Sequence, residues 1–334
     1  MTHTKMKKPF TAAVGFDGYI DRISKVVLQK SENNDDVVYY DNITSFSKEL
    51  LSMAGLSGDL ETVVQEVKIG GNAVNIANGL AVGGAKVTLI ATTNHEVFEN
   101  FHQNVKCYSF GTPGDTLALE FNDGKIMLAD TTHMRDAVIS AVNSKPICSE
   151  IIRAYSSAEL CVFANWACMP EMQDLWDIAV KALSSRGDKP CIYLDLADFS
   201  KRSDSDVEKL IRSIELLRGD RAYLGLNEKE TILLAHHLGY DRNDVIEAAG
   251  LIYSSLKIDV ITHAIGSCYY AGRSGELAVA GKTALKPVIS TGAGDCFSAA
   301  WCSAIMWGYD VSAAMNYANN IVYDFVTTGT IEFY

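Results

Sequence analysis

The sequence lacks a basic block beyond "KMKK" at Lys5–Lys8, and its 334 residues carry a formal net charge of -12. Binding to nucleic acid requires a basic face, so we expect no nucleic-acid partner. Long hydrophobic runs are also missing. The apolar stretch from Cys296 to Tyr309 is too short to cross a bilayer, and the "FTAAVGF" that follows the N-terminal lysines is too brief for a signal peptide. We therefore expect no membrane partner.

None of the eight cysteines forms a C-x-x-C pair, and most of them lie in apolar runs. This pattern argues against zinc binding and disulfides, and it predicts reduced thiols in a cytoplasmic protein. No Pro/Ser-rich linker, low-complexity tract or internal repeat interrupts the chain, so we expect a single domain over residues 1–334. Hydrophobic residues make up 48% and charged residues 21%, which is enough apolar material for a sizeable core.

Strand-like and helix-like segments alternate along most of the chain. Strands are predicted at 11–16, 86–92, 159–165, 191–196, 222–227 and 259–265, and helices at 72–85, 171–183, 204–217 and 244–256. Two further helices close the chain, one ending near 307 and one from 311 to about 326. Such alternation predicts a doubly wound α/β fold, with a mostly parallel sheet flanked by helices. Ligands of such sheets bind beyond the carboxyl ends of the strands, which is where we look for chemistry.

Two stretches break the alternation. Two β-rich runs flank a polar turn between residues 25 and 43, and a second pair at 116–130 surrounds Asp123-Gly124, a dipeptide that favours tight hairpins. We expect them to form a small separate sheet, from about 24–43 and 115–130. This sheet either acts as a lid over the site or is a pair of surface hairpins without a gating role.

The stretch "TGAGD", residues 291–295, places glycines directly before an apolar helical run. The first amides of a helix lack intrahelical partners and carry partial positive charge, and glycine lets an anion approach them closely. Gly292, Ala293 and Gly294 therefore predict a phosphate cradle. Asp295 at the same helix start could accept a proton from an attacking hydroxyl group. The alternative is an ordinary helix cap.

A second glycine motif lies in "KIGGNAVN", where Gly70 and Gly71 end a predicted strand and Asn72 and Asn75 open a helix. Asparagine amides both donate and accept hydrogen bonds, so they suit the hydroxyl groups of a polyol. The alternative is a glycine turn followed by an asparagine cap.

Acidic residues mark two other strand ends. Asp17 and Asp21 follow the first strand, where they suit sugar hydroxyls or a metal, or else lie in a solvated turn. Asn227 and Glu230 have the spacing N-x-x-E. At a helix start, such a carboxylate can hold Mg²⁺ through water, and the same spacing fits a capping box, so the two roles are compatible.

The order of these motifs resembles the ribokinase-like (PfkB) family of carbohydrate kinases over nearly the whole chain. "STGAGDCF" and "GGNAVNIANGLAVGGAKVTLI" carry the resemblance most specifically. It implies a doubly wound domain with a small β-sheet lid, Mg²⁺-ATP as phosphate donor, and a sugar or nucleoside as acceptor. We expect a sugar kinase, with a nucleoside kinase as the alternative on the same fold. Because lid hairpins can pair across subunits, we also consider a homodimer.

The resemblance also assigns roles to individual positions. The implied catalytic base is Asp295, with an anion hole at Gly292, Ala293 and Gly294; the acceptor site is Gly70, Gly71, Asn75 and either Asp17 or Asp21; the magnesium and phosphate site is Asn227 and Glu230; and the nucleotide contacts are Asn227, Thr262, Gly266 and Asn319.

Some positions depart from the family pattern. Ile289 lies six residues before Asp295, where relatives often carry an acid associated with a monovalent cation, so activation by potassium is not expected. The nucleotide loop usually reads Thr-x-Gly, whereas "THAIGS" spreads Thr262 and Gly266 apart.

Asp195 and Arg202 occupy positions that suggest substrate or phosphate contacts.

Two classes compete with a kinase. A catalytically silent sugar- or nucleotide-binding protein is disfavoured by the intact "TGAGD" with its acid. A nicotinamide dehydrogenase would need G-x-G-x-x-G after the first strand, where "FDGYID" stands instead. Tyr39 and Tyr40 could form an aromatic wall for a nucleoside, but they could equally stack against a pyranose. His263, at a strand end, fits a structural histidine better than a ligand contact.

Overall fold

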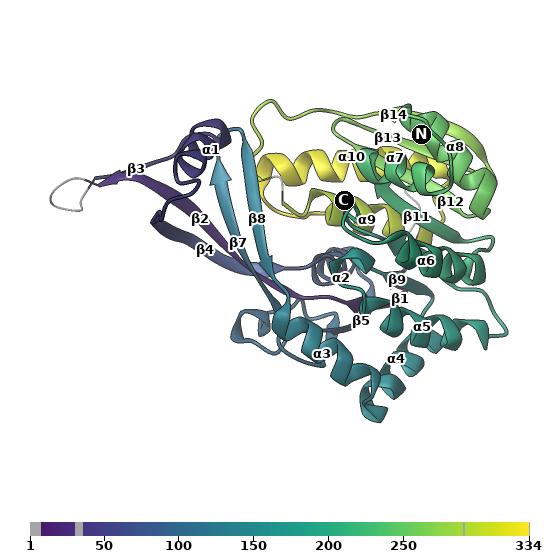
Figure 1. The fold of residues 1–334 in the computed structure, drawn as a ribbon. Coiled ribbons are helices and arrows are strands. Elements are labelled where there is room, and N and C mark those ends of the chain that lie inside the picture. The colour runs from purple at the N-terminus through teal and green to yellow at the C-terminus, as the bar shows by residue number, and fades with distance from the viewer. Residues whose placement is uncertain (1–7, 31–35, 290, 334) are drawn as a thin grey trace.

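The computed structural model describes residues 8–30, 36–289 and 291–333 (Figure 1). Its larger sheet has the order β14-β13-β12-β11-β10-β9-β1-β5-β6, and every neighbouring pair from β12 to β6 is parallel. These strands are β1 (Thr11–Phe16), β5 (Lys86–Ala91), β6 (Val105–Ser109), β9 (Leu160–Phe163), β10 (Cys191–Asp195), β11 (Ala222–Asn227), β12 (Asp259–Ala264), β13 (Ser267–Gly272) and β14 (Gly275–Ala280). Strand order reverses at β1, so the carboxyl ends of β1 and its neighbours form the crevice where such folds bind ligands.

Helices cover both faces of this sheet, as the sequence predicted. One face is covered by α2 (Asn72–Val82), α9 (Ala293–Met306) and α10 (Val311–Thr328). The other is covered by α3 (Thr132–Val142), α4 (Lys145–Ser157), α5 (Met172–Ser184), α6 (Asp204–Leu217), α7 (Glu228–His237) and α8 (Val245–Leu256). Two single 3₁₀ turns, Glu96–Phe98 and Trp166–Cys168, also belong to this part of the molecule. Within the described ranges, no helix is both long and apolar enough to cross a membrane.

The central strands show why their sequences are continuously apolar. In β9, Leu160 and Val162 pack with the α2, α9 and α10 face, whereas Cys161 and Phe163 pack with the opposite face. Successive side chains of a strand point to opposite sides, so a strand covered on both sides needs apolar residues at every position.

A second sheet of five strands, which we call the small sheet, projects from the main body (Figure 1). Its strands are β2 (Tyr19–Lys30), β3 (Val37–Tyr39), β4 (Thr62–Gly70), β7 (Gly114–Phe121) and β8 (Gly124–Asp130). The hairpin predicted at Asp123-Gly124 is confirmed as the antiparallel pair β7–β8, and β2 pairs with β3 as expected. The polar turn predicted between those two strands, residues 31–35, lies outside the described residues.

The predicted bounds of this sheet, about 24–43 and 115–130, are too narrow. Strand β2 already begins at Tyr19, and β4 pairs with it from Gly70 back to Thr62. The first error arose because the strand starts among acids that resemble a turn. The second arose because the pairing of β4 with β2 depends on tertiary structure rather than on local pattern. Helix α1 (Ile43–Ser52), between β3 and β4, adds a small separate core, in which Phe46 packs on Val26 and Leu119.

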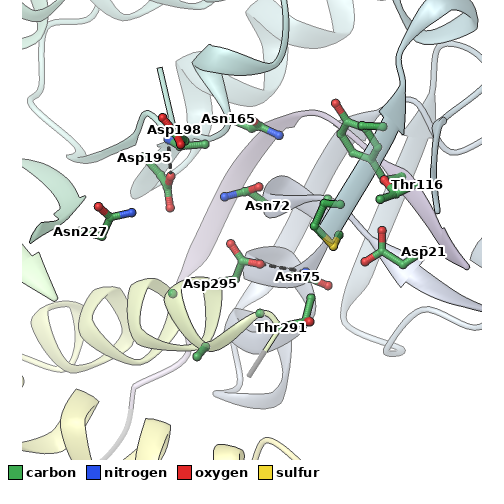
Figure 2. A pocket seen from close by; sticks show the side chains of 18 of the residues that line it. Asp21, Asn72, Asn75, Thr116, Asn165, Asp195, Asp198, Asn227, Thr291 and Asp295 are labelled. Atoms are coloured by element: carbon green, nitrogen blue, oxygen red, sulfur yellow. Dashed lines mark hydrogen bonds between the residues drawn. The ribbon is translucent and has the colours of Figure 1, made fainter. Parts of the chain in front are cut away.

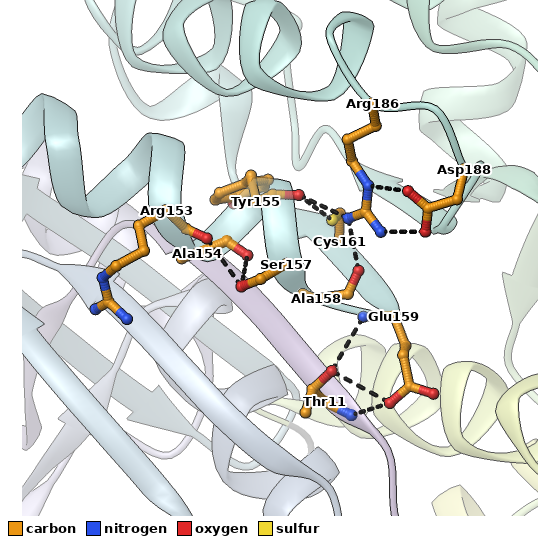
Figure 3. A network of polar contacts seen from close by, with 10 residues as sticks. All are labelled: Thr11, Arg153, Ala154, Tyr155, Ser157, Ala158, Glu159, Cys161, Arg186 and Asp188. Atoms are coloured by element: carbon orange, nitrogen blue, oxygen red, sulfur yellow. Dashed lines mark hydrogen bonds and ion pairs between the residues drawn. The ribbon is translucent and has the colours of Figure 1, made fainter.

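A polar network fixes the amino ends of the central strands (Figure 3). At the start of β1, Thr11 donates its backbone N–H to the Glu159 carboxylate at 2.8 Å. Nearby, Arg186 donates to the carbonyl oxygens of Tyr155 and Ala158 at 2.9 and 2.7 Å, and so satisfies two free carbonyls at the end of α4. This network lies at the opposite end of the strands from the crevice, so it is structural.

Candidate active site

Two cavities meet at the start of α9, above the carboxyl ends of the central strands. The first, which we call the polar cavity, has a volume of about 420 Å³ and lies between the two sheets. The second, the apolar cavity, has a volume of about 540 Å³ and lies between β12, α9 and α10. Four residues line both: Asn227, His263, Ala293 and Gly294. The two cavities therefore share the helix start that the sequence marked as an anion cradle.

The geometry of that helix start requires its glycines. Gly292 is the N-cap of α9 and has a φ of 81°, in the left-handed region that favours glycine. A Cβ on Gly294 would come within 3.2 Å of His263 Cε1. The first amides of α9 therefore stand at the junction with little side-chain cover, which suits a negatively charged group.

Asp295 lies in the first turn of α9, lines the polar cavity, and is 8% exposed (Figure 2). Its carboxylate accepts a hydrogen bond from the Asn75 side-chain amide at 2.8 Å. Burial raises its pKa well above the ordinary value, and the nearby Asp195 carboxylate adds to this, whereas the bond from Asn75 opposes it. Asp295 is thus a buried proton acceptor whose basicity is enhanced by its surroundings.

The two acids after β1 have different surroundings. Asp17 is fully buried; it accepts hydrogen bonds from the backbone amides of Asn72 and Ala73, both at 2.9 Å, and from the Asn165 side chain at 2.8 Å. It therefore anchors the start of α2 and is not among the residues that line either cavity. Asp21, on β2 of the small sheet, does line the polar cavity. Burial raises the pKa of Asp21, and the positive charge of Lys68 partly opposes this increase.

The glycine pair before α2 makes room for these acids. A Cβ on Gly70 would come within 2.5 Å of the Asp21 carboxylate. Gly71, the N-cap of α2, has a φ of 100°, and a Cβ there would lie 2.9 Å from the Gly18 Cα. Gly71 and Asn75 line the polar cavity, as does Asn72, whereas Gly70 lies behind Asp21.

The N-x-x-E motif forms the capping box that its spacing suggested. The Asn227 side chain accepts from the Glu230 backbone amide at 2.9 Å, and the Glu230 carboxylate accepts from the Asn227 backbone amide at 2.9 Å. Both residues line the polar cavity. Burial raises the pKa of Glu230 to about 8, and the Asp195 charge adds to the effect. Burial likewise raises the pKa of Asp195, which also lines the cavity, to about 6.

These carboxylates suit a hydrated divalent cation. Among the described residues, no group of three His, Cys, Asp or Glu side chains is placed to hold a metal directly. Mg²⁺ commonly keeps several waters and is held by one or two carboxylates together with substrate phosphates. Burial raises the pKa of both Asp195 and Glu230, and the Asp195 charge raises that of Glu230 further, so positive charge near them would be favourable.

Three of the four predicted nucleotide residues, Asn227, Gly266 and Asn319, line the apolar cavity beside Phe297 and Val322. Thr262 is not among its lining residues. It is fully buried, and its hydroxyl pairs with the Thr231 hydroxyl at 2.9 Å. The structure therefore places the predicted Thr262 contact in the packing between β12 and α7 instead.

His263 occupies the boundary between the cavities and lines both. Its ring centroid lies 5.4 Å from that of Phe297. Burial lowers the pKa of its imidazole to about 4, so the ring is neutral near pH 7. The sequence favoured a purely structural role, and the structure adds that this side chain is part of the site wall.

Arg202 does not reach the site, contrary to expectation. Its guanidinium lies 4.2 Å from the Trp166 ring centroid and 3.5 Å from the Asp206 carboxylate, and it lines neither cavity. Asp195, predicted with it, does line the polar cavity; it accepts from the Ala197 amide at 3.1 Å.

Sequence reasoning missed several lining residues. Asn165 and Asp198 lie within three residues of the ends of β9 and β10, so the rule that ligands bind beyond the carboxyl ends of strands could have found them. The small sheet contributes Tyr19, Thr116, Met127 and Ala129. No local pattern marks those four, because their position depends on how the small sheet is placed over the main sheet.

Comparisons with known proteins agree with this fold. The family model described as prokaryotic ketohexokinase matches residues 5–332. A ketohexokinase from Haloferax volcanii is 24% identical over 325 residues, which is 95% of this chain and 86% of that protein. Ribokinase from Thermotoga maritima has a similar structure (TM-score 0.65, 16% identity, 96% of this chain and 94% of that one). So does a putative ribokinase II from Escherichia coli in complex with ATP and Mg²⁺ (TM-score 0.65, 16% identity, 95% and 93%). The resemblance to ribokinase-like kinases is thereby confirmed.

Proposed function

Since the chain belongs to the prokaryotic ketohexokinase family of carbohydrate kinases, we propose that it transfers the γ-phosphate of ATP to a hydroxyl group of a ketohexose. Asp295 is the general base, and the helix start at Gly292, Ala293 and Gly294 is the anion hole. The observation that carries this proposal is the shared wall of the two cavities: an acceptor in one and a nucleotide in the other would face each other across that helix start.

The reaction follows from this placement. A sugar hydroxyl in the polar cavity gives its proton to the Asp295 carboxylate while its oxygen attacks the γ-phosphorus, and the bond from that phosphorus to the bridging β–γ oxygen breaks, releasing ADP. Amides at the α9 start stabilise the charge on the transferring phosphoryl group. Asn75 holds the base in position. Asp21, Asn72 and Thr116, which line the same cavity, supply hydrogen-bond partners for the other hydroxyls.

The charged residues that line the two cavities differ, and the difference supports a nucleotide in the apolar cavity and a sugar in the polar one. The apolar cavity is lined by two lysines and one acid, Lys229, Lys282 and Glu228, whereas the described lining of the polar cavity contains no lysine or arginine and five acids: Asp21, Asp195, Asp198, Glu230 and Asp295. Triphosphate charge is therefore favoured on the first side, and an uncharged acceptor on the second. This argues against a sugar phosphate or sugar acid as acceptor.

The nucleotide would place its base near Asn319 and its phosphates toward α9. Mg²⁺ would be held through water by Glu230, with Asn227 beside it, and would supply charge neutralisation for the phosphates. A nucleoside acceptor finds less support, since Tyr39 and Tyr40, the aromatic wall considered for it, are not among the lining residues, and Tyr40 packs on Phe46 instead.

The proposal includes two further expectations, on the cellular compartment and on the oligomeric state. All eight cysteines are free, which fits the reducing cytoplasm. The small sheet, which we propose closes over the acceptor, exposes large apolar side chains such as Leu28 (53%) and Leu128 (53%), which fits a homodimer formed through this sheet. Light scattering on a size-exclusion column tests the dimer, and a monomeric mass at micromolar concentration would exclude it.

The central experiment is a coupled assay with Mg²⁺-ATP and a panel of ketohexoses, aldohexoses, pentoses and nucleosides. We expect turnover highest with a ketohexose, and NMR of the product identifies the hydroxyl that is phosphorylated. Asp295→Asn should reduce kcat by roughly 10²- to 10⁴-fold, the usual contribution of a positioned base, while nucleotide binding and the melting temperature persist. Tight sugar binding without turnover across the panel would favour a silent binding protein.

A further inference from the structure

Lys125 connects the small sheet to the loop that begins the anion cradle. It is the residue after Gly124 at the tip of the β7–β8 hairpin, and β8 pairs it with Glu120 of β7. Its ammonium group donates a hydrogen bond to the Thr291 hydroxyl. Thr291 lines the polar cavity and directly precedes Gly292.

The direction of this side chain follows from strand alternation. Met127 and Ala129 of β8 line the polar cavity. Residues two apart on a strand share a face, so Lys125 points to the same side of the small sheet. The hydrogen bond to Thr291, 166 residues away in sequence, agrees with this orientation.

The Lys125 ammonium group is surrounded by acidic side chains. Burial lowers the pKa of its ammonium group, and the charges of Asp21, Glu120 and Asp295 act in the opposite direction. The ammonium group is thus within electrostatic reach of both the acceptor-side acid and the base, whereas no lysine or arginine is among the described lining residues of the polar cavity itself. A phosphoryl group in the α9 cradle carries negative charge that backbone dipoles alone neutralise only in part.

Building on the proposed function, we propose that Lys125 is a γ-phosphate-binding residue, delivered by the small sheet to the acceptor side of the anion hole. In the unliganded protein the ammonium group rests on Thr291. With a triphosphate bound, it donates to a γ-phosphate oxygen instead, which its flexible four-carbon side chain allows. The same contact couples closure of the small sheet to the presence of the γ-phosphate.

A binding experiment tests this without any sugar. Affinities for the non-hydrolysable triphosphate analogue AMP-PNP and for ADP, both with Mg²⁺, are measured by calorimetry on the wild type, Lys125→Met and Lys125→Arg. We expect Lys125→Met to weaken AMP-PNP binding by about 10- to 100-fold, the usual effect of losing a hydrogen bond to a charged group, and to leave ADP binding within about twofold. Lys125→Arg should recover part of the loss.

The matched control is Lys25→Met, which removes a lysine of the same sheet that lies over the Tyr39 ring at 5.5 Å; it should bind both nucleotides as the wild type does. Equal weakening of AMP-PNP and ADP by Lys125→Met, or no change in either, overturns the proposal and leaves Lys125 a structural tether. In turnover, a tether predicts a raised sugar KM, whereas phosphate binding predicts a lowered kcat with little change in that KM.

Failure of the proposed function gives a different pattern. If the wild type binds AMP-PNP but phosphorylates no sugar, the kinase proposal is wrong. The AMP-PNP and ADP affinities of the Lys125 variants can still be compared with those of the wild type. A wild type that binds neither nucleotide overturns both.

Discussion

The Asn75 side-chain amide donates a 2.8 Å hydrogen bond to the Asp295 carboxylate and so joins the starts of α2 and α9, which are 220 residues apart in sequence. This bond fixes the carboxylate in the polar cavity at the point where the cavity meets the α9 amides. It is also the contact that lowers the pKa of Asp295 against the effect of burial. The two glycine motifs of the sequence thus meet in one pair of side chains.

Removing that bond should affect both the rate and its pH dependence. In Asn75→Ala we expect kcat to fall by about 10- to 100-fold, since a hydrogen bond to a charged group contributes roughly 1.5–3 kcal/mol. Losing a bond to the charged form raises the pKa of the base, so the acidic limb of the kcat/KM profile should move to higher pH. Asn78→Ala, one turn further along α2, is the control and should leave the profile unchanged. An unshifted limb in Asn75→Ala would exclude this role.

Substitutions of the two acids after β1 should have different effects, one on the stability of the fold and the other on sugar binding. Asp17→Ala leaves two backbone amides and the Asn165 amide without their acceptor, so we expect a loss of about 2–4 kcal/mol in the free energy of unfolding. Asp21→Asn should raise the KM for the sugar while the melting temperature stays near that of the wild type. Denaturant titration and steady-state kinetics on both variants check this. An unchanged free energy of unfolding in Asp17→Ala would contradict its anchoring role. An unchanged sugar KM in Asp21→Asn would show that the acceptor contact lies elsewhere.

His263 should make the protein sensitive to acid. Its folded pKa of about 4 lies below the unfolded value near 6.5, so the unfolded chain binds more protons between these limits and stability rises with pH there. Acidification from pH 7 to 4 should therefore remove stability, on the order of 2–3 kcal/mol from this residue. His263→Phe keeps a ring against Phe297 but cannot titrate. Unfolding at several pH values should show that the stability difference between the two proteins moves in favour of His263→Phe from pH 7 to 4, and parallel curves for the two proteins would contradict the assignment.

Much of the fold could be predicted because its signals are local. The alternation of apolar strands and amphipathic helices predicts a doubly wound sheet, and the Asp123-Gly124 pair predicts the β7–β8 hairpin. The Asn227 and Glu230 capping box spans three residues, so its spacing contains its whole geometry. The same is true of the Gly292 cap, which depends only on φ at one position and on the helix that follows.

The sequence by itself determined the layers of this protein, its helix starts and the acid in the first turn of α9, because each depends on residues within a few positions of one another. Only the tertiary structure decided that Asp21 rather than Asp17 faces the polar cavity, that Thr262 and Arg202 pack away from it, and that Lys125 reaches Thr291. These outcomes depend on the register of β2 with β4 and β7 and on how the small sheet is placed over the main sheet. A shift of one residue would turn every side chain of a strand to the other face, and pairing between distant segments, which no local pattern encodes, prevents that shift.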